Sequence, residues 1–286
     1  MTALITLPNN IHQVSSKWLH QHLNNPNVII LDATTEDPTV DAEKQLKGVI
    51  PGSKRFDFNK EIVDTEATSP NMMPSPTIFE AKVKALGINQ DSIVIVYDKQ
   101  GLFSAARPWW MFKTLGFNQV AILQGGLPAW INAGFSVEPD YAQTTITGDF
   151  TASKDKGLFV DKQYVLNSLS NSETQIVDAR GYGRFSGQMK EPRENMRSGH
   201  IPNSLNLHYA TLINDGQLLE TEKLKEIFHQ LVPTPGEFVF SCGSGVTACI
   251  LALAADIAGF DNIKVYDGSW SEWGADKLLP IDTVSK

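Results

Sequence analysis

The sequence predicts an α/β protein of two homologous domains, each a mainly parallel sheet with helices on both faces. Short apolar runs of four to seven residues alternate with segments of helical pattern, which is typical of βα units whose sheets are covered on both sides. The same order of elements occurs twice. The 286 residues also exceed the usual size of one domain.

The first half alternates helical segments with β-type runs. Runs rich in Val and Ile predict strands, and segments with helix-forming residues predict helices. In chain order we expect a helix at 16–23 (SKWLHQHL), a strand at 28–33 (VIILDA), a helix at 79–87 (FEAKVKALG), a strand at 92–98 (SIVIVYD), a helix at 104–117 (SAARPWWMFKTLGF) and a strand at 120–123 (VAIL).

The second half repeats this order. We expect a helix at 162–169 (KQYVLNSL), a strand at 175–180 (QIVDAR), a helix at 221–231 (TEKLKEIFHQL), a strand at 237–242 (EFVFSC), a helix at 247–260 (TACILALAADIAGF) and a strand at 263–266 (IKVY). The matched landmarks are Asp32 with Asp178, Asp98 with Cys242, and Trp130 with Trp273. Their separations of 146, 144 and 143 residues keep a register that chance similarity would not keep. The repeat therefore indicates a duplicated domain.

The polar stretch between the halves predicts the domain boundary. It lies within 138–157, carries no helical stripe, and resembles a linker that runs along the surface. We therefore expect domains at 1–140 and 159–286, joined by a linker at 141–158.

Composition excludes several classes of function. A net charge of −8 and a pI near 5.3 argue against nucleic acid or an anionic membrane as a partner. No window approaches the eighteen apolar residues of a membrane span, and the N-terminal stretch lacks the basic region of a secretory signal. A cytoplasmic location is therefore expected. The two cysteines, seven residues apart, fit neither a disulfide framework nor a metal or redox motif.

The stretch FSCGSGVTACI puts Cys242 at a turn between a strand and a helix. Gly243 and Gly245 let the backbone fold tightly and turn its N–H groups inward, which makes a small nest for an anion. Only the thiolate is a strong nucleophile, and a nest at a helix N-terminus stabilises negative charge on sulfur, including that of a persulfide. Cys249 is interpreted as a core residue of the helix.

The duplication tests whether Cys242 is merely a packing residue. At the matching turn the first half has Asp98, followed by KQGLFSA. A carboxylate is a poor substitute for a packed thiol, whereas both residues suit a loop. The comparison favours a functional Cys242.

Four of the six arginines lie within eighteen residues of the second half: Arg180, Arg184, Arg193 and Arg197. Arginine suits forked recognition of carboxylate or sulfonate oxygens. We interpret Arg184 and Arg193 as ligand-binding, because they follow a strand on the carboxyl edge where Cys242 also lies. Arg197 and Lys190 are interpreted as parts of a solvated basic loop.

Other polar and aromatic residues are given structural roles. His200 in SGHIPNS is interpreted as a hydrogen-bonding residue rather than a base. The tryptophans at 109, 110, 130, 270 and 273 are interpreted as core. For Ser244 two interpretations stay open: a donor to sulfur or substrate, or a plain loop residue.

At these residues the chain resembles the tandem rhodanese family over nearly its full length, and within it the 3-mercaptopyruvate sulfurtransferases. Their loop CG[ST]GVT matches 242–247, and their substrate-binding arginines lie in GRF and EPR phrases, here with Arg184 and Arg193. The resemblance implies an inactive first domain and a catalytic second one. It implies catalytic Cys242 and Ser244, with an active-site loop completed by Gly243, Gly245, Val246 and Thr247.

The implied reaction moves sulfane sulfur from 3-mercaptopyruvate, through a Cys242 persulfide, to a thiol or cyanide. It requires no metal or organic cofactor, and a thiol protein such as thioredoxin is the expected acceptor. One departure concerns the first domain, where the family usually has a histidine opening an HIPG phrase and this chain has Val49. Whether that change alters activity, and what Asp41 does, stay open.

Three alternatives are weighed against this function. Thiosulfate could be the donor, although thiosulfate-preferring relatives carry charged residues in the loop and this loop has none. A Cys-dependent phosphatase would need Arg six positions after the nucleophile, where Ala248 stands. A non-enzymatic sulfur carrier would need Cys242 but not the two arginines.

Overall fold

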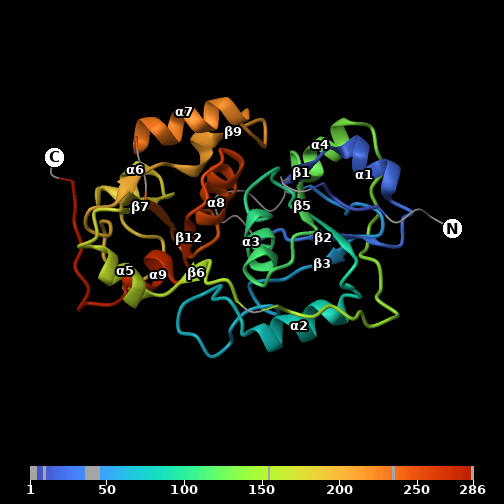
Figure 1. The fold of residues 1–286 in the computed structure, drawn as a ribbon, viewed down its shortest axis with the longest axis horizontal. Coiled ribbons are helices and arrows are strands. Elements are labelled where there is room, and N and C mark those ends of the chain that lie inside the picture. Colours follow the sequence, from blue (N-terminus) through green and yellow to red (C-terminus); the bar gives the residue numbers. More distant parts are fainter. Residues whose placement is uncertain (1–4, 9–10, 36–45, 154, 234–235, 285–286) are drawn as a thin grey trace. The chain divides into compact units, whose positions relative to one another are not determined.

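The computed structural model describes residues 5–8, 11–35, 46–153, 155–233 and 236–284 (Figure 1). The chain divides into two compact units. The first unit contains the described residues of Met1–Val63, Pro74–Lys156 and Asp215–Leu218, and the second contains those of Asp64–Met73, Gly157–Asn214 and Leu219–Lys286. Among the described residues, no helix is both long enough and apolar enough to cross a membrane.

The first unit is built on a parallel five-stranded sheet in the order β1-β5-β4-β2-β3. Its strands are β1 (Gln13–Val14), β2 (Val28–Asp32), β3 (Lys54–Arg55), β4 (Ile93–Tyr97) and β5 (Val120–Leu123). Its helices are α1 (Ser16–His22), α2 (Pro76–Ala85), α3 (Ala106–Thr114) and α4 (Gly126–Asn132).

The second unit repeats this sheet with the parallel order β6-β12-β11-β7-β8. Its strands are β6 (Phe159–Val160), β7 (Thr174–Asp178), β8 (Leu205–Asn206), β11 (Glu237–Ser241) and β12 (Ile263–Tyr266). Its helices are α5 (Lys162–Ser168), α6 (Tyr182–Phe185), the 3₁₀ helix η2 (Tyr209–Leu212), α7 (Thr221–Leu231), α8 (Ala248–Ile257) and α9 (Ser269–Trp273). Two short strands stand between η2 and α7 in the chain: β9 (Ile213–Asn214) belongs to the second unit, and β10 (Gln217–Leu218) belongs to the first.

Each central strand is buried on both faces, as expected of a covered parallel sheet. In the first unit, one face of β4 packs in a core cluster with Leu19 of α1 and Trp130 of α4. Phenylalanine rings of α2 and α3 pack together in a second cluster. In the second unit, Val239 packs with Trp270 and Trp273. The predicted α/β class with two homologous parallel sheets is confirmed.

The boundaries differ from the sequence prediction in small ways. Helix α2 begins at Pro76 rather than 79, because the Ser75 side chain caps it and proline fits its first turn. Helices α4 and α9 were not predicted, because Gly126 and Pro128 occupy the first turn of α4 and α9 spans only five residues. The outer strands of both sheets were missed since two residues carry no periodicity.

The stretch 141–158 predicted as a linker lies mostly at the surface, and part of it is anchored to the first unit. Residues up to 156 belong to the first unit, where Phe150 is fully buried and its ring contacts Phe79 and Phe112. Segment 64–73 differs more: it comes from the first half of the chain but packs in the second unit. Each compact unit therefore includes one short segment from the other half of the sequence, 64–73 in the second unit and 215–218 in the first.

Candidate active site

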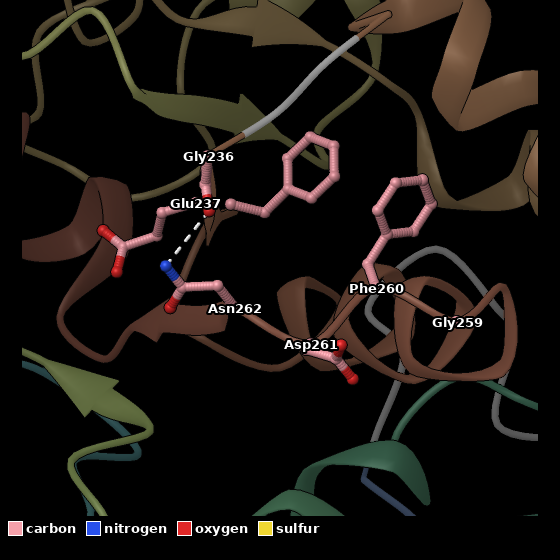
Figure 2. A pocket seen from close by; sticks show the side chains of 7 residues that line it. Gly236, Glu237, Gly259, Phe260, Asp261 and Asn262 are labelled. Atoms are coloured by element: carbon pink, nitrogen blue, oxygen red, sulfur yellow. Dashed lines mark hydrogen bonds between the residues drawn. The ribbon is translucent and has the colours of Figure 1, made fainter.

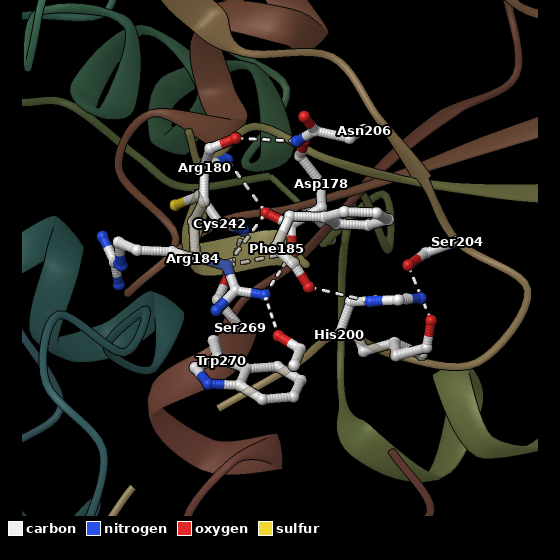
Figure 3. Close-up of polar contacts among 12 residues, drawn as sticks. Asp178, Arg180, Arg184, Phe185, His200, Ser204, Asn206, Cys242, Ser269 and Trp270 are labelled. Carbon is white, nitrogen blue, oxygen red and sulfur yellow. Dashed lines mark hydrogen bonds and ion pairs between the residues drawn. The ribbon is translucent and has the colours of Figure 1, made fainter. Parts of the chain in front are cut away.

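Cys242 follows the central strand of the second sheet, at its carboxyl edge. Strand β11 ends at Ser241, which pairs with Asp178 at the end of β7. The six residues 242–247 then lead to α8, and the Cys242 side chain lies in this turn (Figure 3). The residue is only 2% exposed. Its thiol therefore sits in a buried turn at the sheet edge where open α/β folds bind ligands.

The start of α9 holds the backbone of the turn. Trp270 donates its N–H to the Cys242 carbonyl at 3.0 Å, and Ser271 donates to the Gly243 carbonyl at 2.9 Å. Ser269 is fully buried, and its hydroxyl accepts the Cys242 N–H at 3.1 Å and donates to the Tyr266 carbonyl at 2.8 Å. The backbone of the thiol-bearing residue is thus fixed on both sides.

Ser269 has a left-handed backbone conformation, with φ of 49°. The matching residue of the first unit is Gly126, with φ of 53°, followed by Leu127, whose N–H donates to the Asp98 carbonyl. Glycine takes this conformation without strain, whereas a residue with a Cβ pays about 1 kcal/mol. The second unit bears that strain and gains the hydroxyl that binds Cys242.

In the matching turn of the first unit, which follows β4, backbone N–H groups bind an anion. One carboxylate oxygen of Asp98, Oδ2, accepts three backbone N–H groups, from Phe103, Ser104 and Ala105, at 2.8 to 2.9 Å. The other oxygen accepts from Gln100 at 2.9 Å. The turn after the central strand is therefore an anion nest, and in the first unit its own carboxylate fills it.

Arg184 lies against the cysteine loop (Figure 3). A Cβ built on Gly243 would sit 3.3 Å from its Nη2, so the absence of a side chain there makes room for the guanidinium. Its Nε and Nη2 bind the buried carboxylate of Glu191 at 3.2 and 2.5 Å. No partner for its Nη1 lies among the described residues, so one edge of the fork remains available.

Arg193 reaches the same loop through a hydroxyl. Its Nη1 donates to Ser271 Oγ at 2.9 Å, and that hydroxyl donates to the Gly243 carbonyl at 2.5 Å. Arg193 is otherwise exposed. Both predicted binding arginines therefore converge on Gly243, one residue after the thiol.

Arg180 and Arg197 are structural. The Arg180 guanidinium binds Asp178 and Glu191 and lies 4.3 Å from the Trp270 ring centroid. Arg197 donates to four backbone carbonyls, of Trp273, Gly274, Asp276 and Leu279. The prediction of a solvated Arg197 is wrong, since its guanidinium donates to a cluster of carbonyls at and after the end of α9. Lys190 is exposed, as predicted.

Ser244 is 9% exposed and has a partner that sequence reasoning missed. The side-chain amide of Asn71 donates to its hydroxyl at 3.1 Å and to its carbonyl at 3.4 Å. Nothing in the loop sequence points to Asn71, which stands 173 residues earlier. Val49, by contrast, is 3% exposed within the first unit and pairs its backbone with Glu138. Asp41 lies outside the described residues.

The remaining loop residues have mainly backbone roles. Gly245 is left-handed with φ of 73°, which explains glycine there. Val246 is 8% exposed, and Thr247 is the N-cap residue of α8, although its side chain makes no capping hydrogen bond. Cys249 is fully buried in α8, where its thiol contacts the Gly245 carbonyl at 3.2 Å.

His200 has the structural role that the sequence suggested. Its ring stacks on Phe185 with centroids 3.9 Å apart, and Nδ1 hydrogen-bonds the Phe185 carbonyl at 2.8 Å (Figure 3). This contact fixes α6, which carries Arg184.

A separate cavity of about 300 Å³ opens at the opposite end of β11 (Figure 2). It is lined by residues 236–238 and 259–262, and the Asn262 side chain closes one side by donating to the Gly236 carbonyl. Because β11 runs from Glu237 to Ser241, this cavity lies away from Cys242. It contains none of the predicted site residues.

A family model described as a rhodanese-like domain matches residues 15–133 and again 161–276. The chain belongs to the rhodanese family. Its relatives include the 3-mercaptopyruvate sulfurtransferase of Escherichia coli K12, 38% identical over 276 residues that cover 95% of this chain and 98% of the relative. The thiosulfate sulfurtransferase of Cricetulus griseus is 37% identical over 91% of both chains.

Two solved structures are similar to this chain over nearly its whole length. The crystal structure of SseA from Escherichia coli, described as a 3-mercaptopyruvate sulfotransferase, is 35% identical with a TM-score of 0.81 and covers 91% of this chain and 99% of that one. Tum1 of Saccharomyces cerevisiae is 26% identical with a TM-score of 0.83, over 96% and 99% of the two chains. The rhodanese fold thus accounts for both sheets and both turns.

Proposed function

We propose that this chain is a 3-mercaptopyruvate sulfurtransferase whose nucleophile is Cys242. The observation that carries the proposal is the convergence of Arg184 and Arg193 on Gly243, beside a buried cysteine in a turn that can hold an anion. The relatives named as 3-mercaptopyruvate sulfurtransferases support this choice of donor.

The two arginines bind the charged end of the substrate. 3-Mercaptopyruvate carries a carboxylate and a keto oxygen, and a guanidinium fork matches two adjacent oxygens. Glu191 is buried and shared between Arg180 and Arg184, so the Arg184 fork is held in place before substrate arrives. This preorganisation lowers the entropy lost on binding.

The reaction has two transfers. The Cys242 thiolate attacks the substrate sulfur, an S–S bond forms, the C–S bond breaks, and the electron pair leaves on carbon as the enolate of pyruvate, which takes up a proton. The persulfide then rests in the loop, whose inward N–H groups stabilise its charge as they do for the Asp98 carboxylate. An acceptor thiolate or cyanide attacks the outer sulfur and releases the Cys242 thiolate.

A reduced thiol is the natural second substrate of this chemistry. A small thiol, or a thiol protein such as thioredoxin, would accept the sulfur in a reducing compartment such as the cytoplasm. The reacting end of the acceptor must be narrow enough to enter the loop, because Cys242 is only 2% exposed.

Donor assays and mass spectrometry test the proposal. With 3-mercaptopyruvate, the protein should gain the mass of one sulfur atom on Cys242 and release pyruvate. Cys242→Ser should abolish both results. Cys249→Ala is the matched control, since Cys249 is the other cysteine and lies in the core of α8, and it should keep them. Sulfur on Cys249, or an active Cys242→Ser variant, contradicts the assignment.

Thiosulfate is the second candidate donor. The Cricetulus griseus relative at 37% identity is named a thiosulfate sulfurtransferase, and the same two arginines could bind a sulfonate. The loop at 242–247 contains no charged residue to add to them. Steady-state kinetics with both donors side by side decide the preference, and a larger kcat/KM for thiosulfate would reverse our choice.

A further inference from the structure

Asn71 belongs to a segment that crosses from the first half of the sequence into the second unit. Segment 64–73 packs in that unit, and two contacts hold it there. The Met73 N–H donates to the Asp267 carboxylate at 2.7 Å, and the Asn71 amide binds Ser244. Asn71 is 6% exposed, with φ of 64°. A buried asparagine with a left-handed backbone is uncommon. Packing alone does not require its amide to bind a loop that lies 173 residues later in the chain.

The chemistry of this contact fixes the orientation of the amide. A backbone carbonyl only accepts hydrogen bonds, so the group that faces the Ser244 carbonyl must be the amide nitrogen of Asn71. The same nitrogen carries a second hydrogen, which is directed at Ser244 Oγ, 3.1 Å away. Ser244 Oγ is therefore the acceptor in this pair.

The consequence concerns the hydroxyl hydrogen of Ser244. Since Oγ already accepts from Asn71, its own O–H is left to donate, and no acceptor for it lies among the described residues. We propose that Asn71 is a positioning residue that makes Ser244 a hydrogen-bond donor to the substrate bound at Cys242. The inference rests on the proposed function, because it assumes that a substrate oxygen or sulfur lies beside the loop.

This arrangement differs from a proton relay. An amide neither takes up nor releases a proton near neutral pH, so Asn71 cannot deprotonate Ser244. The pair supplies a fixed hydrogen bond, and its effect should fall on the rate of the first transfer rather than add a titrating group to the pH profile.

A double-mutant cycle tests the proposal. Asn71→Gly removes the amide but keeps the left-handed backbone without strain, and Ser244→Ala removes the hydroxyl. Each should lower kcat/KM for the sulfur donor about tenfold, the scale of one hydrogen bond. If Asn71 acts through Ser244, the double variant should be no worse than Ser244→Ala alone. Losses that multiply to about a hundredfold would overturn the proposal.

Asn71→Asp is the sharper variant, because it changes the hydrogen bond with almost no change in shape. The carboxylate accepts instead of donating, so it draws the Ser244 hydroxyl toward itself and faces the Ser244 carbonyl unfavourably. We expect activity at neutral pH to fall at least as far as in Asn71→Gly. Relative to the parent at the same pH, its activity should recover partly as pH falls toward about 5, because a protonated carboxyl can donate again and burial raises its pKa. A parent-like Asn71→Asp variant contradicts the proposal.

Asn203→Gly is the matched control. Asn203 is also left-handed, with φ of 62°, and its amide donates to the Leu169 carbonyl in the same unit. It has no part in the cysteine loop, so its variant should keep kcat/KM within twofold of the parent. If Asn203→Gly lowers kcat/KM as much as Asn71→Gly does, replacing a left-handed asparagine lowers activity by changing the backbone. That result would contradict a specific role for the Asn71 amide.

An assay that needs no sulfur donor separates this inference from the proposed function. The rate of Cys242 alkylation by iodoacetate, an anionic probe, can be measured for the same variants. Slower alkylation in the single variants, with no further loss in the double variant, supports the coupling even if 3-mercaptopyruvate is not the donor. Equal alkylation rates in all four proteins, with donor turnover present in the parent and unaffected by the variants, overturn the inference and leave the proposed function intact.

Discussion

Gly243 is the residue around which the candidate binding groups gather. It leaves space for the Arg184 guanidinium, and its carbonyl accepts the Ser271 hydroxyl that Arg193 also binds. Any side chain at this position would meet Arg184. The residue therefore links the substrate-binding charges to the thiol one position earlier.

Loss of either arginine should weaken use of the donor. We expect Arg184→Ala and Arg193→Ala each to lower kcat/KM for 3-mercaptopyruvate about thirtyfold, or about 2 kcal/mol, the scale of a charge-assisted hydrogen bond. Kinetics with both donors measure this. Lys190→Ala, in the same exposed loop, is the control and should stay near the parent. If the arginine variants also match the parent, these arginines do not bind substrate.

At the scale of elements, the start of α9 and the cysteine loop act together. The two units build this junction differently, with Gly126 in the first and a strained Ser269 in the second. Strain of this kind is found where function requires a particular side chain. The hydroxyl that Ser269 supplies is bound to the Cys242 N–H.

Two substitutions at Ser269 separate strain from hydrogen bonding. Ser269→Gly relieves the left-handed strain as it removes the hydroxyl, so the free energy of unfolding should change by less than about 1 kcal/mol. Ser269→Ala keeps the strain and loses the hydrogen bonds, and should destabilise by about 2 kcal/mol. Both should lower kcat/KM about tenfold. Urea unfolding and kinetics check the pair, and a fully active Ser269→Gly would show that the hydroxyl has no catalytic value.

The Asp98 turn should be important for the stability of the first unit. Removing its carboxylate leaves several buried N–H groups without an acceptor, at about 1–3 kcal/mol each. We expect Asp98→Ala to reduce the free energy of unfolding by about 3 kcal/mol, and Asp98→Asn by less, since its amide oxygen still accepts. Urea unfolding measures both, and an unchanged Asp98→Ala would contradict the nest.

At the scale of the whole molecule, the two copies of the fold differ in the residue that occupies the turn after the central strand. Both keep the same strand order and the same turn after the central strand. The second has a thiol in that turn, with Arg184 and Arg193 beside it. The first fills its turn with a carboxylate, which occupies the place that a bound anion would take.

Moving the thiol to the first unit should not move the activity. In the double variant Cys242→Ser, Asp98→Cys, we expect no sulfur transfer, because no counterparts of Arg184 and Arg193 accompany the new thiol in the repeat. Mass spectrometry after donor treatment should find no persulfide. The Asp98→Cys single variant is the control for folding, and activity in the double variant would show that the turn alone suffices.

The sequence by itself determined the α/β class, the duplication and the position of the thiol turn. These follow from local patterns: the alternation of Val- and Ile-rich runs with helical segments, two glycines around Cys242, and a fixed offset between the halves. It also pointed to Arg184 and Arg193, because both stand in short phrases that resemble those of a known family.

Only the tertiary structure decided which groups meet. Arg180, Arg184, Arg193 and Arg197 look alike in one short segment, and their roles separate only through partners far along the chain, such as the carbonyls that bind Arg197. The Asn71–Ser244 contact joins residues 173 positions apart, and segment 64–73 packs in the unit opposite to its place in the sequence. Local patterns record secondary structure because they depend on neighbouring residues. Contacts of this kind depend on how the whole chain folds back on itself, which no short window contains.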